Sequence, residues 1–220
     1  ILIYLMVFRV DVLMYLMAFS TPFSIVIQSD KINLGLSVPT EVIMIAVTLL
    51  FLCRVFYDLS LNRKILKHPI TLAILAYLTW MFITCITSEY PLVSFKFLAS
   101  KIWFICSSYF MVIHLIEKDL SKWVRYFNCY AVALTAVVLI TTVKYAAYGF
   151  QGHIAHWIMN PFYNDHTAYG AILALFIPIV FGFIFLPQKS THLRIFYGTM
   201  TLVFLMGFYF SYSRAAWLSL

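Results

Sequence analysis

The chain has 220 residues, of which 64% are hydrophobic and 10% charged, and its formal net charge at pH 7 is +7. A soluble globular domain carries about 25% charged residues, so this composition excludes an ordinary water-soluble fold. The Lys and Arg residues lie in short segments between apolar runs rather than in one tract, which argues against a nucleic-acid partner.

Apolar runs long enough to cross about 30 Å of hydrocarbon recur along the whole sequence, and charges, prolines or turn residues separate them. We therefore predict an all-α, polytopic transmembrane bundle that forms a single domain over residues 1–220 and contacts membrane lipids. Seven spans are expected, at Val12–Ile27, Glu41–Tyr57, Ile70–Thr87, Ile102–Ile116, Phe127–Val143, Ala168–Leu186 and Ile195–Phe210. The sequence starts at Ile1 and stops inside an apolar stretch at Leu220, so we expect a longer protein whose bundle continues beyond this C-terminal end.

Basic residues near span ends favour the cytoplasmic side of a membrane, so their distribution predicts the orientation. Ten of the 15 fall on one side of the predicted bundle, namely Arg9, Arg54, Arg63, Lys64, Lys67, Lys118, Lys122, Arg125, Lys189 and Arg194. The other side holds five, namely Lys31, Lys96, Lys101, Lys144 and Arg214. The start of the chain is therefore predicted to be cytoplasmic, and the loops around Asp30, Glu89 and His153 to face outward.

The sequence predicts no metal site and no cofactor. Four cysteines lie within or beside apolar segments without a CxxC pair, and we expect them to be free, buried thiols: Cys53, Cys85, Cys106 and Cys129. His153 and His156 are spaced as HxxH, but the HExxH pattern of zinc hydrolases is absent. We interpret His153 and His156 as histidines at the membrane interface rather than as zinc ligands.

The longest polar and aromatic connection is GFQGHIAHWIMNPFYNDHT, residues 149–167, on the predicted outer side. Pro161 disfavours a helix there, and Asn164 or Asp165 is placed to cap a helix that starts near Ala168. His166 could act as a base or a donor, and the helix N-terminus offers backbone N–H groups to an anion. The simpler alternative is a capping and turn cluster without chemistry.

Arg214 follows an apolar run directly, in the segment SYSRAAW. An arginine at this depth needs a partner or a water-filled cavity, and its planar fork suits phosphate oxygens. The alternative is an interfacial anchor, since Tyr212 and Trp217 lie at the same level. Three outer lysines could complete a cationic rim that holds a pyrophosphate, although each alone is more often an anchor: Lys96, Lys101 and Lys144.

Two segments carry a resemblance to a known family. NDHTAYGAILALFIP at residues 164–178, followed by FSYSRAAWLSL at residues 210–220, resembles the O-antigen ligase and polymerase family of lipid-linked oligosaccharide transferases. In that family an Asn/Asp-His element opens one span and a Ser-Arg-small-small-aromatic element follows the next. FSTPFS at residues 19–24 and SVPTEV at residues 37–42 also look like the first outer loop of such proteins. Ala215 stands where the family usually has Gly after the arginine.

The resemblance implies an enzyme of the bacterial inner membrane that takes a glycan from an undecaprenyl pyrophosphate carrier on the periplasmic side, without a metal ion. The acceptor would be a hydroxyl of lipid A-core, of another glycan or of a protein. Arg214 would bind the donor pyrophosphate and stabilise the departing charge, with Asn164, Asp165, His166 and the outer lysines as further substrate-binding residues in a polar cavity. The family's base is a histidine in a later periplasmic loop, which His166 does not match, so residues 1–220 alone are expected to be inactive.

Three alternatives remain open from the sequence. A polysaccharide polymerase or protein transferase of the same family would share this part of the chain. A transporter or flippase of lipid-linked sugars would also need outer cationic groups, but it should show two repeated halves with broken helices, and no repeat is visible. A membrane scaffold without catalysis would not need Arg214.

Overall fold

The computed structural model of the chain describes residues 9–29, 34–58, 63–119, 121–151, 154, 157–186 and 190–219. The chain forms two compact units. The first comprises Ile1–Met14 and Glu41–Val124, and the second comprises Tyr15–Thr40 and Arg125–Leu220. The single transmembrane domain expected from the sequence stays a prediction.

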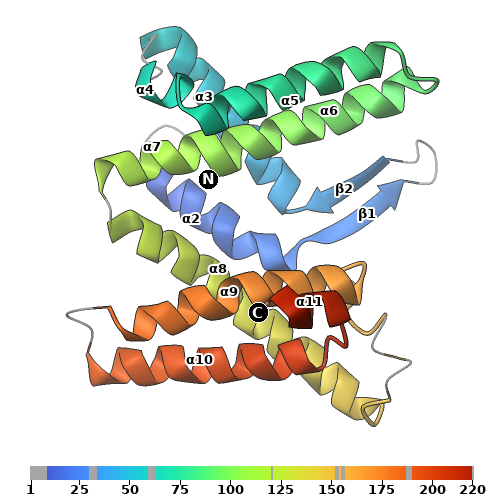
Figure 1. The fold of residues 1–220 in the computed structure, drawn as a ribbon, viewed down its shortest axis with the longest axis vertical. Coiled ribbons are helices and arrows are strands. Elements are labelled where there is room, and N and C mark those ends of the chain that lie inside the picture. Colours follow the sequence, from blue (N-terminus) through green and yellow to red (C-terminus); the bar gives the residue numbers. More distant parts are fainter. Residues whose placement is uncertain are drawn as a thin grey trace. The chain divides into compact units, whose positions relative to one another are not determined.

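The first unit contains a helical hairpin of α5 (Pro69–Ile86) and α6 (Pro91–Ile105), which pack antiparallel (Figure 1). Proline opens both helices, where its missing N–H costs no helical hydrogen bond. One π-helical turn, η2 (Cys106–Phe110), joins α6 to α7 (Met111–Lys118), so that Pro91–Glu117 forms one long helical segment. The other helices with residues in this unit are α2 (Val10–Ser20), α3 (Thr40–Asp58), α4 (Arg63–Leu66) and the start of α8 (Ser121–Ala147).

Hydroxyl groups link the helices of the first unit. The Thr71 hydroxyl on α5 shares a hydrogen bond of 2.9 Å with the Tyr109 hydroxyl of the π-turn. The Thr48 hydroxyl on α3 donates to its own helix and lies 3.3 Å from the Trp103 carbonyl of α6. Such contacts between helices are expected where no water is present to satisfy a polar side chain.

The second unit contains most of α8, with α9 (His166–Ile184), α10 (Thr191–Tyr209) and the short α11 (Arg214–Ser219). Both α10 and α11 pack against α9 (Figure 1). A 3-10 turn, η1 (Thr21–Phe23), leads from α2 into an antiparallel hairpin of β1 (Ile25–Ser29) and β2 (Leu34–Val38). In its register Ile25 pairs with Val38 and Ser29 with Leu34.

The core of the second unit forms where α8, α9 and α10 meet at Tyr169. Its side chain is almost fully buried, and its hydroxyl lies 3.3 Å from the Thr141 hydroxyl of α8. On α10, a methyl group at Gly207 would lie 2.7 Å from the Tyr169 hydroxyl and 2.6 Å from Val138 Cγ1. The missing side chain of Gly207 is therefore what lets α10 approach the other two helices.

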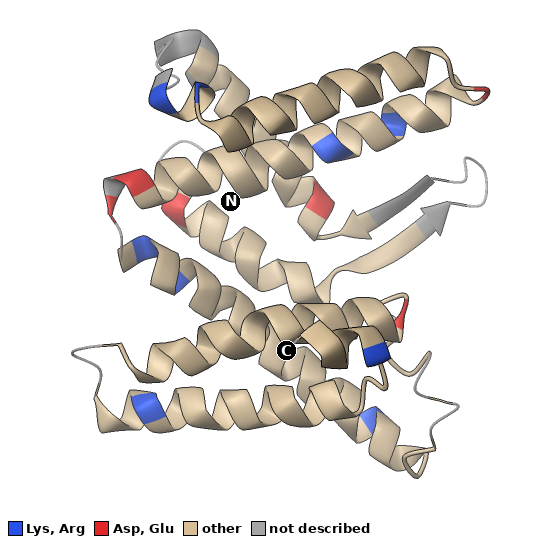
Figure 2. Cartoon of the chain, in the orientation of Figure 1, with Lys and Arg blue, Asp and Glu red and all other residues tan. Residues whose placement is uncertain are grey.

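Apart from the β-hairpin of β1 and β2, the described residues form an all-α membrane protein. Within the described residues, four helices are long and apolar enough to cross a bilayer: Pro69–Ile86, Pro91–Glu117, Ser121–Ala147 and His166–Ile184. They coincide with the third to the sixth predicted spans. Figure 2 shows α5 and α9 without charged residues, as the sequence of each confirms. The first, second and seventh predicted spans overlap helices α2, α3 and α10, which are not among these four.

Three sequence predictions need correction. The first span was expected to continue to Ile27, but α2 ends at Ser20 and Ile25–Ser29 forms a strand. Ser20 and Thr21 donate their hydroxyls to the Met17 carbonyl at 3.1 and 2.7 Å, Pro22 cannot continue the helical hydrogen bonds, and the β-branched run that follows favours a strand. Of the four cysteines that were expected to be buried, Cys85 and Cys106 are buried, Cys129 is half-buried, and Cys53 is exposed on α3.

The fourth span was expected to start at Ile102, but its helix starts at Pro91. No residue between Pro91 and Ile102 interrupts a helix, whereas the predicted start was placed directly after Lys101. Lys96 and Lys101 therefore lie on the helix itself and not in a loop before it.

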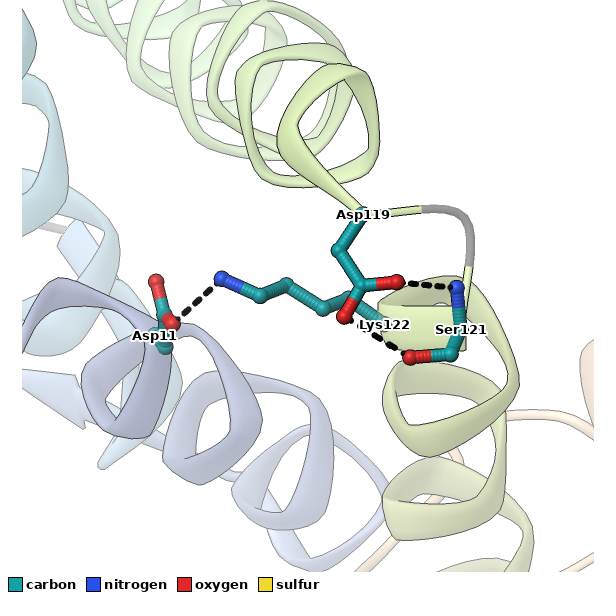
Figure 3. A network of polar contacts seen from close by, with 4 residues as sticks. All are labelled: Asp11, Asp119, Ser121 and Lys122. Atoms are coloured by element: carbon teal, nitrogen blue, oxygen red, sulfur yellow. Dashed lines mark hydrogen bonds and ion pairs between the residues drawn. The ribbon is translucent and has the colours of Figure 1, made fainter.

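An ion pair in the first unit joins the start of α2 to the start of α8 (Figure 3). The Lys122 ammonium lies 2.6 Å from Asp11 Oδ2, and the Asp119 carboxylate accepts from the Ser121 backbone N–H at 2.9 Å and from its hydroxyl at 2.8 Å. The distribution of basic residues predicts that both helix starts lie on the same side of a membrane. The ion pair brings these two helix starts into contact, and the side on which they lie stays a prediction.

We expect the Gly207→Ala variant to be less stable than the wild type by up to about 2 kcal/mol. Overpacking against Val138 and Tyr169 costs about 1–3 kcal/mol, which outweighs the helix propensity of about 1 kcal/mol that alanine gains. Gly198→Ala on the same helix is the matched control, because nothing lies within 4 Å of the added methyl. Thermal unfolding of the purified protein in detergent measures both variants, and equal shifts in their midpoints would contradict the tight approach of α10.

Candidate functional site

The candidate site is the loop end of the second unit, which we define as the end where α8 and α10 finish and α9 and α11 begin (Figure 1). Tyr145, near the end of α8, is buried and its ring makes edge contacts with Phe150, Phe210 and Tyr212 at 5.2–6.5 Å. These contacts join the end of α8 to the segment that leads from α10 into α11. The two segments that carry the family resemblance both reach this end.

At the start of α9, Asp165 occupies the cap position expected from the sequence, although the helix begins at His166 rather than near Ala168. The Asp165 carboxylate is held by its two neighbours. His166 Nδ1 lies 2.6 Å from Oδ1, and the Thr167 hydroxyl donates to Oδ2. The Thr167 hydroxyl and, to a smaller extent, His166 hold the pKa of Asp165 below its usual value of 3.8, so the carboxylate is ionised at neutral pH. Asn164 is exposed.

The first turn of α9 packs against the second resembling segment at Gly170. A methyl group at this position would lie 2.9 Å from Ala216 Cβ, 3.0 Å from Ser211 Oγ and 3.1 Å from Ser213 Cβ. The contact is therefore possible only because residue 170 has no side chain. It brings the NDHTAYG and SYSRAAW segments together, which the sequence alone could not establish.

Residues 211–217 form a tightly bonded connection that holds α11. Ser211 and Ser213 are buried, the Ser211 hydroxyl donates to the Phe208 carbonyl at 2.7 Å, and the Ser213 hydroxyl accepts from the Ala216 N–H at 3.4 Å. The Trp217 indole N–H donates to the same Phe208 carbonyl at 3.2 Å. The start of α11 is thus fixed by three side-chain hydrogen bonds to the end of α10 and to its own first turn.

Arg214 is the first residue of α11 and is exposed. Its guanidinium makes no hydrogen bond or ion pair with any residue that the structure describes. Among the described residues, none occupies the five N–H donors of the Arg214 side chain.

Lys144 lies near the end of α8, and its ammonium donates to the Asn160 carbonyl at 3.1 Å. This bond ties α8 to the turn that precedes α9. The early FSTPFS segment contributes to the same end, because the Phe23 ring makes an edge contact with Phe162 at 6.2 Å. The Lys144 ammonium thus uses one of its three N–H donors in the bond to the Asn160 carbonyl.

Lys96 and Lys101 belong to α6 in the first unit, whereas Arg214 and Lys144 belong to the second. Lys96 is half-buried, and the Lys101 ammonium lies 5.2 Å from the centre of the Phe97 ring, a cation–π distance. The cationic rim expected from all four residues stays a prediction.

His153 and His156 lie outside the described residues. Within the described ranges, no group of three or more His, Cys, Asp and Glu residues could hold a metal ion. The residues that the sequence analysis missed are Gly170 and the buried pair Ser211 and Ser213. A signal for them was present, since all are small residues in the two segments that carry the resemblance, and small residues let helices approach closely.

Comparisons with known proteins add no assignment: no family model, no curated protein and no solved structure matches the chain.

We expect Gly170→Ala to loosen the connection between α10 and α11. The nearest obstacle is the Cβ atom of Ala216, which cannot move without its backbone, so residues 211–219 must shift away from α9. Hydrogen exchange of the full-length protein measures this as several-fold faster exchange of the backbone N–H groups in residues 211–219. Gly182→Ala on the same helix meets nothing within 4 Å and should leave their exchange unchanged. Unchanged exchange in Gly170→Ala would show that the two segments do not pack as described.

We also expect Thr167→Val to raise the pKa of Asp165 toward 3.8, because the hydroxyl that stabilises the carboxylate is removed. Since the folded pKa of Asp165 lies below the unfolded value, its contribution to stability is present above pH 3.8 and is lost as the pH falls through the folded pKa. A titration followed by the carboxyl ¹³C chemical shift of Asp165 measures the pKa. Thr199→Val is the control, because that hydroxyl donates only to the carbonyls of its own helix. An unchanged titration in Thr167→Val would rule out the hydroxyl as the cause.

Proposed function

We propose that this chain belongs to a membrane glycosyltransferase that moves a glycan from undecaprenyl pyrophosphate to a hydroxyl acceptor, similar to the O-antigen ligases. The observation that carries the proposal is the contact at Gly170, because it joins the two resembling segments at one end of the second unit. The contact supports the proposal because both resembling segments would then contribute to one donor site.

Arg214 is the donor-binding and catalytic residue of this proposal. Its guanidinium is exposed, is mounted on a hydrogen-bonded segment and is not engaged by a described side chain. Planar N–H donors bind the oxygens of a pyrophosphate in pairs, and they stabilise the charge that develops when the bond to the sugar breaks. Lys144, at the same end, adds a second positive charge within the second unit.

The proposal also implies a location, a membrane topology and an acceptor for the enzyme. The enzyme would lie in the bacterial inner membrane, with α2, α3 and α10 completing seven crossings and with the loop end of the second unit facing the periplasm. The acceptor would be lipid A-core or another glycan. A polymerase or a protein transferase would use the same donor site, because the lipid-linked donor is common to all three reactions.

We expect Arg214→Ala in the full-length protein to abolish glycan attachment in a blot of surface polysaccharide, and Arg214→Lys to retain part of it. Loss of a preorganised donor at a departing anion costs about 100-fold to 1,000-fold in rate. Arg194→Ala is the matched control, since Arg194 is an exposed arginine near the opposite end of α10.

Two outcomes would decide against this function. A scaffold protein would keep wild-type glycan attachment in Arg214→Ala at normal protein levels. A transporter would lose attachment while the lipid-linked glycan accumulates in the inner leaflet, whereas the transferase accumulates it in the outer leaflet, accessible to an added glycosidase.

A further inference from the structure

Three exposed aromatic rings lie on the segment that carries Arg214, and we call them the aromatic platform: Tyr209, Tyr212 and Trp217. Their exposed fractions are 61%, 43% and 47%. The Tyr209 and Trp217 rings are nearly parallel, with centroids 6.0 Å apart and an angle of 13° between them, and the Tyr212 ring lies 6.5 Å from that of Tyr209. A near-parallel pair at this distance is an offset stack, which leaves part of each ring face open.

Contacts with the end of α8 and with α10 hold the rings of the platform in place. The Trp217 indole N–H donates to the Phe208 carbonyl at 3.2 Å. Tyr212 has a φ of 49°, a left-handed conformation that a bulky residue rarely adopts, and its ring makes an edge contact with the buried Tyr145 at 6.5 Å. A ligand that stacks on these rings would therefore lose little side-chain entropy in ordering them.

The indole bond distinguishes the platform from an ordinary aromatic belt. A tryptophan of such a belt keeps its polar N–H at the headgroups, where one end of the ring is wet. The N–H of Trp217 is instead bonded to the Phe208 carbonyl, so the exposed part of the ring offers no hydrogen-bond donor. The negative face of an aromatic ring attracts weakly positive C–H groups. One face of a pyranose ring can present such C–H groups together.

The platform lies beside the positive charge of the candidate site. Trp217 follows Arg214 by three residues on α11, so the two side chains share a helix face, with their Cβ atoms about 5–6 Å apart. Arg214 is also the only charged residue in the sequence from 209 to 219. In a lipid-linked donor the first sugar is bonded directly to the pyrophosphate. A site for that donor therefore needs a cation and an apolar surface side by side.

We propose that the aromatic platform binds the first sugar of the donor glycan while Arg214 binds the pyrophosphate; this inference rests on the proposed glycosyltransferase function. The sugar stacks with the C–H face of its pyranose ring on the rings of Tyr209 and Trp217. This contact selects a pyranose that presents C–H groups on one face, and it orients the anomeric carbon relative to Arg214. The rings act on binding and specificity, and they take no part in bond breaking.

The test measures equilibrium binding of two ligands to the full-length protein in nanodiscs: undecaprenyl pyrophosphate with one attached hexose, and undecaprenyl pyrophosphate alone. The wild type should bind the hexose-linked carrier about threefold to tenfold more tightly, as expected for one stacking contact. Tyr209→Leu and Trp217→Leu should each lower this ratio below twofold and leave the affinity for the bare carrier within twofold of the wild type. Tyr209→Leu keeps the bond between Trp217 and Phe208, so it leaves α11 anchored.

Two variants in the first unit are matched controls, because Tyr77 and Trp80 are exposed aromatic residues on α5. Tyr77→Leu and Trp80→Leu should keep the wild-type ratio. An unchanged ratio in both platform variants overturns the proposal and leaves the rings as a membrane belt. An equal loss of affinity for both carriers in both platform variants also overturns it, because the rings would then only position Arg214.

The same measurement separates this proposal from the proposed function. If the wild type binds both carriers equally and Arg214→Ala weakens both, the donor site stands and only the sugar-binding role of the platform fails. If the wild type binds neither carrier, the donor site fails, and the glycosyltransferase function and the platform fail with it.

Discussion

The absence of a side chain at position 170 lets the first turn of α9 touch the segment that connects α10 to α11. The contact is close enough that one methyl group would collide with three residues, 211, 213 and 216. Ser211 and Ser213 are also buried, and their hydroxyls are hydrogen-bonded within the connection. The position of Arg214 relative to His166 therefore depends on a glycine four residues further along the helix.

A second glycine allows close helix packing deeper in the second unit. At Gly207 the α10 backbone approaches Val138 and Tyr169, and the Tyr169 hydroxyl also reaches Thr141 on α8. Apolar side chains give little preference for one helix neighbour over another in a bilayer, since lipid is equally apolar, so close backbone contacts and hydroxyl groups must supply the specificity. Gly170 extends this packing from the membrane interior to the helix end where the charged residues lie.

The apolar runs predicted helices correctly because each crossing depends on local composition. Pro69 and Asp165 lie at or beside helix starts that the sequence predicts within two residues, whereas the helix start at Pro91 was missed. The hairpin of β1 and β2 was missed because Ile25–Ile27 read equally well as the end of a span. The candidate residues of the second unit were predicted, but their grouping was not, since it results from an interhelical contact at Gly170 that leaves no trace in charge or hydropathy.

An interfacial anchor and a ligand-binding arginine make different demands on their surroundings. An anchor needs only a flexible stem that reaches the headgroups, with aromatic neighbours free to lie at the same level. Around Arg214, however, the Trp217 ring stacks on Tyr209 at 6.0 Å and its indole N–H is bonded to the Phe208 carbonyl. These contacts hold the backbone that carries the guanidinium. A fixed backbone is what a catalytic cation requires, because its donors must already point at the leaving group when charge develops there.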